Sequence, residues 1–88
     1  MNDPRAAQLL RALQIEVMYL LQKHLNETGQ TTEQVAELAG VSDVVVKRMA
    51  AGTYTGMLAY LFAVSLAIGK APTISLTPIE PTPTAPVL

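Results

Sequence analysis

The feature that most constrains this chain is a pattern of small, apolar and turn-forming residues between positions 31 and 52. Gly40 can adopt the positive φ that a tight turn between two helices requires. Ala36 supplies a small side chain where a second helix must cross the first, and Val41 and Val46 supply apolar side chains to fill the space between them. The spacing therefore predicts two short helices joined by a three-residue turn.

Capping signals mark where these two helices begin. Thr31 and Gln34 stand in the spacing of a capping box at the start of the first helix. Ser42 precedes the second helix as its N-cap, and Asp43 follows in the first turn, where the helix dipole favours a carboxylate. We expect the first helix to end at the turn glycine and the second to end at Gly52.

Longer helices are expected on both sides of this pair. Apolar residues recur at three- and four-residue steps over residues 5–27, with Asp3 as a plausible cap before them and Gly29 after them. Residues 57–68 form an uncharged helical stretch that is too short and too interrupted upstream to suggest a membrane span. We therefore expect an all-α, compact domain of four to five helices.

The chain divides into three parts by composition. Residues 1–71 form the helical domain, with the paired helices at 31–52. Residues 72–78 alternate polar and apolar side chains and are expected to be extended or strand-like. Residues 79–88 are rich in proline and are expected to form a flexible tail.

Composition limits the function classes. The chain has no cysteine and one histidine, so we expect no disulfide, no thiolate chemistry and no metal site. No pattern points to catalysis, and we expect no enzyme activity, no cofactor, no small-molecule ligand and no membrane partner. Six basic residues face seven acidic ones, for a net charge of −1. Any binding to DNA must therefore depend on the local placement of a few cations.

The segment Thr-Thr-Glu-Gln-Val-Ala-Glu-Leu-Ala-Gly-Val-Ser at 31–42, with the later Val46-Lys-Arg-Met and Gly52, resembles the lambda-repressor/Cro-like (XRE) helix-turn-helix family. The ending Leu66-Ala-Ile-Gly69 also looks like the end of that family's fourth helix. The resemblance implies a lambda-repressor-like fold and a cytoplasmic, nucleoid-associated transcriptional regulator, such as a repressor of phage or prophage origin. It also implies a homodimer on a pseudo-palindromic operator in double-stranded DNA.

Carried onto this chain, the resemblance places the helix at 42–51 in the major groove. Lys47 or Arg48 would bond guanine, Val44 would meet a thymine methyl and Asp43 would accept from cytosine. Thr32 stands where the family usually has glutamine against a phosphate. The full set of expected DNA-contacting residues is Thr32, Ser42, Asp43, Val44, Lys47, Arg48, Thr53 and Tyr54.

The expected dimer interface uses the uncharged helix and the alternating segment. A helix that is apolar all round must be covered all round, and one protomer of this size can hardly cover it. The second protomer is expected to pack on Leu58, Phe62, Leu66, Ile74 and Leu76. The sequence leaves open whether the dimer forms through this helix, through the alternating segment or through a second apolar stripe on the first helix.

A different class of function also fits. The fold can be kept while DNA binding is lost, which would leave a protein-interaction module such as an antirepressor or adaptor. The acidic balance, Asp43, and the adjacent Val44 and Val45 favour that alternative. A third possibility is a DNA-bound protein that needs a basic companion.

Overall fold

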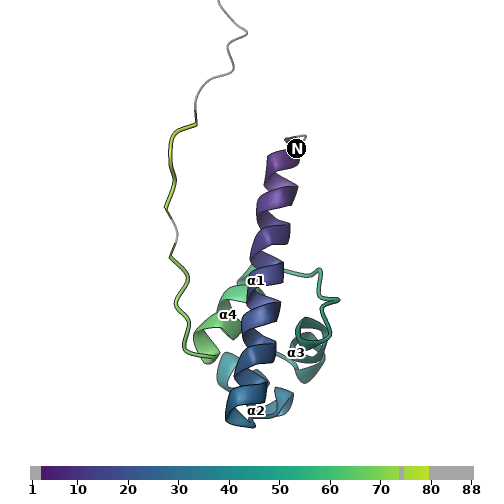
Figure 1. Cartoon of the computed structure of the whole chain (residues 1–88). Helices are drawn as coiled ribbons and strands as arrows, with labels where there is room; N and C mark the ends of the chain where they lie inside the picture. The colour runs from purple at the N-terminus through teal and green to yellow at the C-terminus, as the bar shows by residue number, and fades with distance from the viewer. Residues whose placement is uncertain (1–2, 74, 80–88) are drawn as a thin grey trace, which may run out of the picture.

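A single long helix, α1, forms the axis of the molecule, and three short helices pack around its C-terminal half (Figure 1). The computed structural model describes residues 3–73 and 75–79. These residues form α1 (Pro4–Thr28), α2 (Thr32–Ala39), α3 (Asp43–Ala50) and α4 (Leu58–Ala67). The all-α expectation is therefore confirmed, with four helices in the part of the chain that the structure describes.

The two ends of α1 are formed by the residues expected to cap it. The Asp3 carboxylate accepts a hydrogen bond from the Arg5 backbone N–H at 2.9 Å, and proline occupies the first helical position. At the other end Gly29 adopts φ 74° and its N–H donates to the Leu25 carbonyl oxygen. Only the second half of α1 enters the core, where Val17 and Leu21 are buried, whereas residues 4–12 are all exposed.

α2 and α3 are joined by the tight turn that the sequence predicts. Thr31 Oγ1 accepts from the Gln34 N–H at 3.1 Å and the Thr31 N–H donates to Gln34 Oε1 at 2.9 Å, which completes the capping box. Gly40 adopts φ 72°, and the next N–H, that of Val41, donates to the Ala36 carbonyl oxygen at 3.1 Å. The turn therefore needs glycine for its backbone and sends α3 back across α2.

α4 fills the side of the core opposite α3. Leu61 and Val64 are fully buried between α1 and α2, because α4 turns one apolar face inward. Leu66 on its outer face remains exposed in the single chain, and Leu58 near its N-terminal end is partly exposed toward α1. No helix within residues 3–73 and 75–79 combines the length and apolar character needed to cross a bilayer.

The segment after α4 is extended. Residue 73 and residues 75–79 have no regular secondary structure, and the segment runs away from α4 alongside α1 (Figure 1). The strand that the alternating pattern allowed is therefore not formed by the described residues of this single chain. Ile74 and the proline-rich tail expected at 79–88, apart from Ile79, lie outside the described residues.

Candidate nucleic-acid interface

One side of α3 is buried and the other is exposed. Val46 and Met49 are fully buried against the rest of the domain, because they lie three residues apart on the inward face. On the outward face Val44 is 57% exposed, and Lys47 and Arg48 are also exposed. Three of the residues expected to contact DNA therefore lie together on one exposed helical surface, the outer face of α3.

Val45 differs from its neighbour Val44. Its side chain is half-buried and packs against the core cluster. The pair of valines is therefore not a continuous exposed patch: Val44 faces solvent and Val45 contributes to packing.

An ion pair lies along the first turns of α3. Lys47 Nζ is 2.9 Å from Asp43 Oδ2, four residues earlier on the helix. This contact lowers the pKa of the Asp43 carboxyl and raises the pKa of the Lys47 ammonium. The second carboxylate oxygen, Asp43 Oδ1, is buried and accepts no hydrogen bond from the described residues. Neither oxygen is presented for a base, so we assign Asp43 to pairing with Lys47.

The charge on the outer face of α3 is unevenly compensated. Besides Asp43, the carboxylate of Glu33 on α2 acts on Lys47 and favours its charged form. Among residues 3–73 and 75–79 the ion pairs are Asp3–Arg5 and Asp43–Lys47, so Arg48 belongs to neither. Arg48 is therefore the cation on this face best placed to meet a phosphate or a guanine.

Two hydroxyl-bearing residues lie near the start of α2 and α3. Ser42 is exposed, and its Oγ accepts a long hydrogen bond of 3.4 Å from the Val45 N–H, which leaves its own proton to donate. Thr32 is half-buried at the first position of α2. Both lie at helix N-termini, where backbone N–H groups favour an anion.

The loop after α3 divides its residues between the surface and the core. Thr53 is exposed and is held by its N–H, which donates to the Arg48 carbonyl oxygen at 2.9 Å. Tyr54 is only 5% exposed, and its hydroxyl donates to the Met57 carbonyl oxygen at 2.9 Å. The side chain of Tyr54 therefore packs in the core and is not available for the DNA contact that the sequence predicted for it.

Gly56 explains how the Tyr54 ring fits there. A Cβ at position 56 would lie 2.6 Å from the Tyr54 hydroxyl oxygen and 2.8 Å from its Cζ. The absence of a side chain at Gly56 therefore leaves the space that the ring occupies. The sequence indicates this packing only by placing a tyrosine two residues before a glycine.

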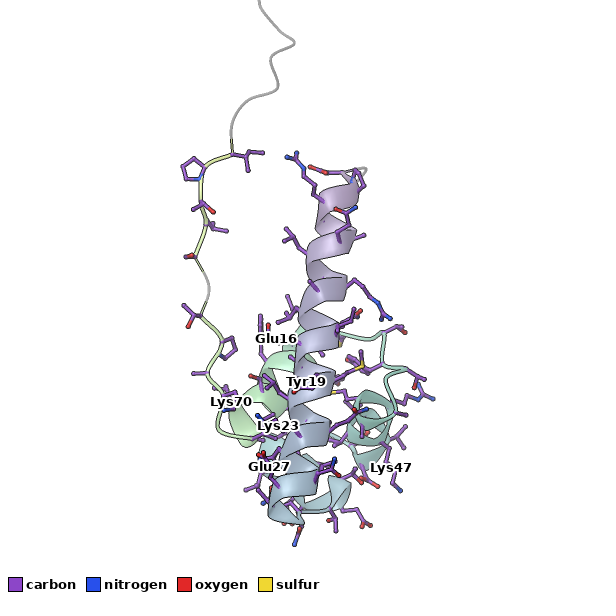
Figure 2. All side chains as sticks on the ribbon, viewed as in Figure 1. Glu16, Tyr19, Lys23, Glu27, Lys47 and Lys70 are labelled. Carbon is purple, nitrogen blue, oxygen red and sulfur yellow. The ribbon has the colours of Figure 1, made fainter. Side chains whose placement is uncertain are left out.

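The cations of the domain do not gather on one side. Figure 2 shows Lys47 on the α3 side of α1 and Lys70 on the α4 side. Lys23 of α1 lines a shallow depression together with Lys70 rather than extending the outer face of α3. The local positive charge available to DNA at α3 is therefore small.

The expected dimer residues do not form one patch in the single chain. Leu58 and Phe62 line a groove between α4 and α1, whereas Leu66 points to solvent elsewhere on α4 and Leu76 is exposed on the extended segment. Sequence reasoning missed the exposed leucines at the start of α1, Leu9 and Leu10. Helix length could have predicted their exposure, because α1 has 25 residues and partner helices of eight to ten residues are too short to cover its whole length.

Comparison of the chain with protein-family models, with curated proteins and with solved structures gives no significant match. The family resemblance therefore remains an expectation from the sequence, and the function has to be argued from the surface of α3.

Proposed function

We propose that this chain is a lambda-repressor-like helix-turn-helix protein that binds double-stranded DNA as a homodimer and regulates transcription. In this proposal α3 enters the major groove and α2 lies across the backbone. The observation that carries it is the outer face of α3, where Val44, Lys47 and Arg48 are exposed together while Val46 and Met49 anchor the helix from behind.

The roles on this face follow from chemistry and exposure. Arg48 would bond the O6 and N7 acceptors of a guanine or a phosphate, and Val44 would contact a thymine methyl. Ser42 and Thr32 would donate to phosphate oxygens from the helix starts, and Thr53 would do so from the loop. Two copies on a two-fold axis would place their α3 helices about one turn of DNA apart, so the site would be pseudo-palindromic.

The charge balance predicts the character of this binding. With Lys47 paired to Asp43, few cations neutralise phosphates, so non-specific affinity and salt dependence should both be low. Specific affinity would depend mainly on Arg48 and on contacts in the groove.

Arg48→Ala tests the assignment. If Arg48 bonds a base, the variant should lose roughly 5- to 150-fold in affinity for the selected site, which corresponds to about 1–3 kcal/mol. Lys23→Ala is the matched control, because it removes an exposed cation of α1 that lies away from the outer face of α3 and does not line the groove between α1 and α4. Fluorescence anisotropy with a labelled duplex measures both, and an Arg48→Ala protein that binds as tightly as the control would contradict the assignment.

A second candidate function is a protein-interaction module that keeps this fold without binding DNA. The specific observation in its favour is the compensation of Lys47 by Asp43 and Glu33, beside the exposed Val44. Under this alternative Val44→Lys would abolish capture of a protein partner, whereas under the DNA proposal the same change would strengthen non-specific DNA binding.

A further inference from the structure

The first half of α1 extends beyond the rest of the domain. We call residues 4–12 the α1 overhang: all nine are exposed, and in Figure 1 this part of α1 projects past α3 and α4. Leu10 lies two helical turns before the buried Val17, and Leu9 lies one turn before the half-buried Leu13, on the same side of α1. Leu9 remains 72% exposed, although Ile79 of the extended segment lines a shallow depression beside it.

A groove begins where the overhang ends. The α1–α4 groove has a volume of about 590 Å³, and it is lined by Leu13, Val17 and Leu20 of α1 with Leu58 and Phe62 of α4. Residues 70–73, at the start of the extended segment, line it as well. Leu13 continues the apolar stripe of the overhang, which forms a ridge. The ridge and the groove therefore make one continuous apolar face. Glu16 and Lys70 lie among its polar lining residues.

A surface that carries both a ridge and a groove of similar chemistry can complement itself under two-fold symmetry. We propose that a second copy of this chain packs its α1 overhang, antiparallel, into the α1–α4 groove, while its own groove receives the overhang of the first. In this arrangement Leu9 and Leu10 of each copy cover the apolar floor of the other. The interface includes Leu58 and Phe62 but is built on α1, with Leu66 outside it.

The charges fix the direction of the pairing. Arg5 and Glu16 are about three helical turns apart, so both lie on the same edge of the apolar stripe. In an antiparallel pair these equal edges meet, and Arg5 of one copy lies near Glu16 of the partner subunit. Glu16 takes part in neither ion pair of the described residues, and Arg5 is held only by the exposed Asp3 two residues away. A parallel two-fold pair would instead place the two equal edges on opposite sides of the interface, so Arg5 and Glu16 would not meet.

The area of the face predicts a weak dimer. From Ala6 to Leu20 the face is roughly 20 Å long, at 1.5 Å per residue; it is roughly 10 Å wide along the overhang and roughly 20 Å wide where α4 lies beside α1. Its projected area is therefore about 300 Å² per copy. Stable interfaces bury about 600–1,000 Å² on each partner, so this dimer should form only at high protein concentration.

This inference specifies the homodimer of the proposed function, but it does not depend on DNA binding. The test is the mass of the full chain in solution, measured by sedimentation equilibrium without DNA up to about 100 µM. Leu10→Glu should raise the dimer dissociation constant at least about 100-fold, because each dimer buries two such carboxylates in place of leucines. Ile15→Glu is the matched control: it lies on the other side of α1, is 52% exposed and should leave the dimer unchanged.

Charge exchange tests the direction. Glu16→Arg should weaken the dimer about 5- to 10-fold, and Arg5→Glu combined with Glu16→Arg should restore it. Three results would each overturn the proposal: a wild-type chain that stays monomeric, a dimer that tolerates Leu10→Glu, or a dimer that Ile15→Glu weakens as much as Leu10→Glu does. Circular dichroism confirms that each variant remains helical. Loss of DNA binding by Arg48→Ala in a protein that stays dimeric separates the two proposals.

Discussion

Packing of Tyr54 against Gly56 gives a prediction whose size follows from distances. An alanine Cβ at position 56 would lie within 2.6–2.9 Å of three atoms at the outer end of the Tyr54 ring, well inside ordinary van der Waals contact. The ring is buried and its hydroxyl is held by the Met57 carbonyl oxygen, so it cannot move without losing packing. Gly56→Ala should therefore destabilise the fold by about 1–3 kcal/mol, as overpacking does.

A double-mutant cycle isolates this contact. Tyr54→Leu removes the hydroxyl oxygen and the two ring carbons that the new Cβ would meet, so Gly56→Ala should cost less than about 0.5 kcal/mol in that background. Gly52→Ala is the control: Gly52 has φ 79° and open space around it, so alanine there should cost about 1–2 kcal/mol from backbone strain, with or without the tyrosine. Urea unfolding followed by circular dichroism measures each variant. An equal cost of Gly56→Ala in both backgrounds would refute the packing argument.

Other predictions test the turn, the cap, the core and the ion pair. Gly40→Ala should cost about 1–2 kcal/mol in urea unfolding, since φ is 72° there, and Thr31→Ala about 1 kcal/mol through loss of the capping box. Leu61→Ala should cost about 2–5 kcal/mol, because the side chain is fully buried. The pKa of Asp43 is lowered in the fold, so its contribution to stability is present above the unfolded value near 3.8 and is lost as pH falls through the lower folded pKa. In Asp43→Asn the free energy of unfolding should therefore fall less at acid pH than it does in the wild-type chain, as measured by urea unfolding over a pH series. An unchanged loss of stability at acid pH would contradict the ion pair. The same variant releases Lys47, so DNA affinity should rise and its salt dependence should steepen by about one phosphate contact.

Local signals were sufficient to predict the helices. The capping box at Thr31, the turn at Gly40 and the end of α1 at Gly29 each depend on residues within four positions of one another. These interactions are encoded in adjacent residues, so they can be inferred without knowledge of the tertiary structure. The extended alternative for the segment after α4 also agrees with its described residues.

The candidate site was harder to predict because exposure depends on contacts between elements. Tyr54 was expected at the surface, but it enters the core through the space left by Gly56. Val44 and Val45 look alike in sequence, yet one is exposed and the other packs inward. The Asp43–Lys47 pair stands at i,i+4 spacing and was open to prediction from sequence. The exposed start of α1 required knowing how far the other helices reach.

The measurement that most directly tests the account is selection of binding sites from a pool of random duplex DNA by the full-length chain, at two salt concentrations. The account predicts enrichment of a pseudo-palindrome with half-sites about one helical turn apart, bound with a weak salt dependence and lost with Arg48→Ala. Absence of enrichment at both salt concentrations, from a protein shown to be folded and dimeric, would contradict the assignment of α3 to DNA and favour the protein-interaction alternative.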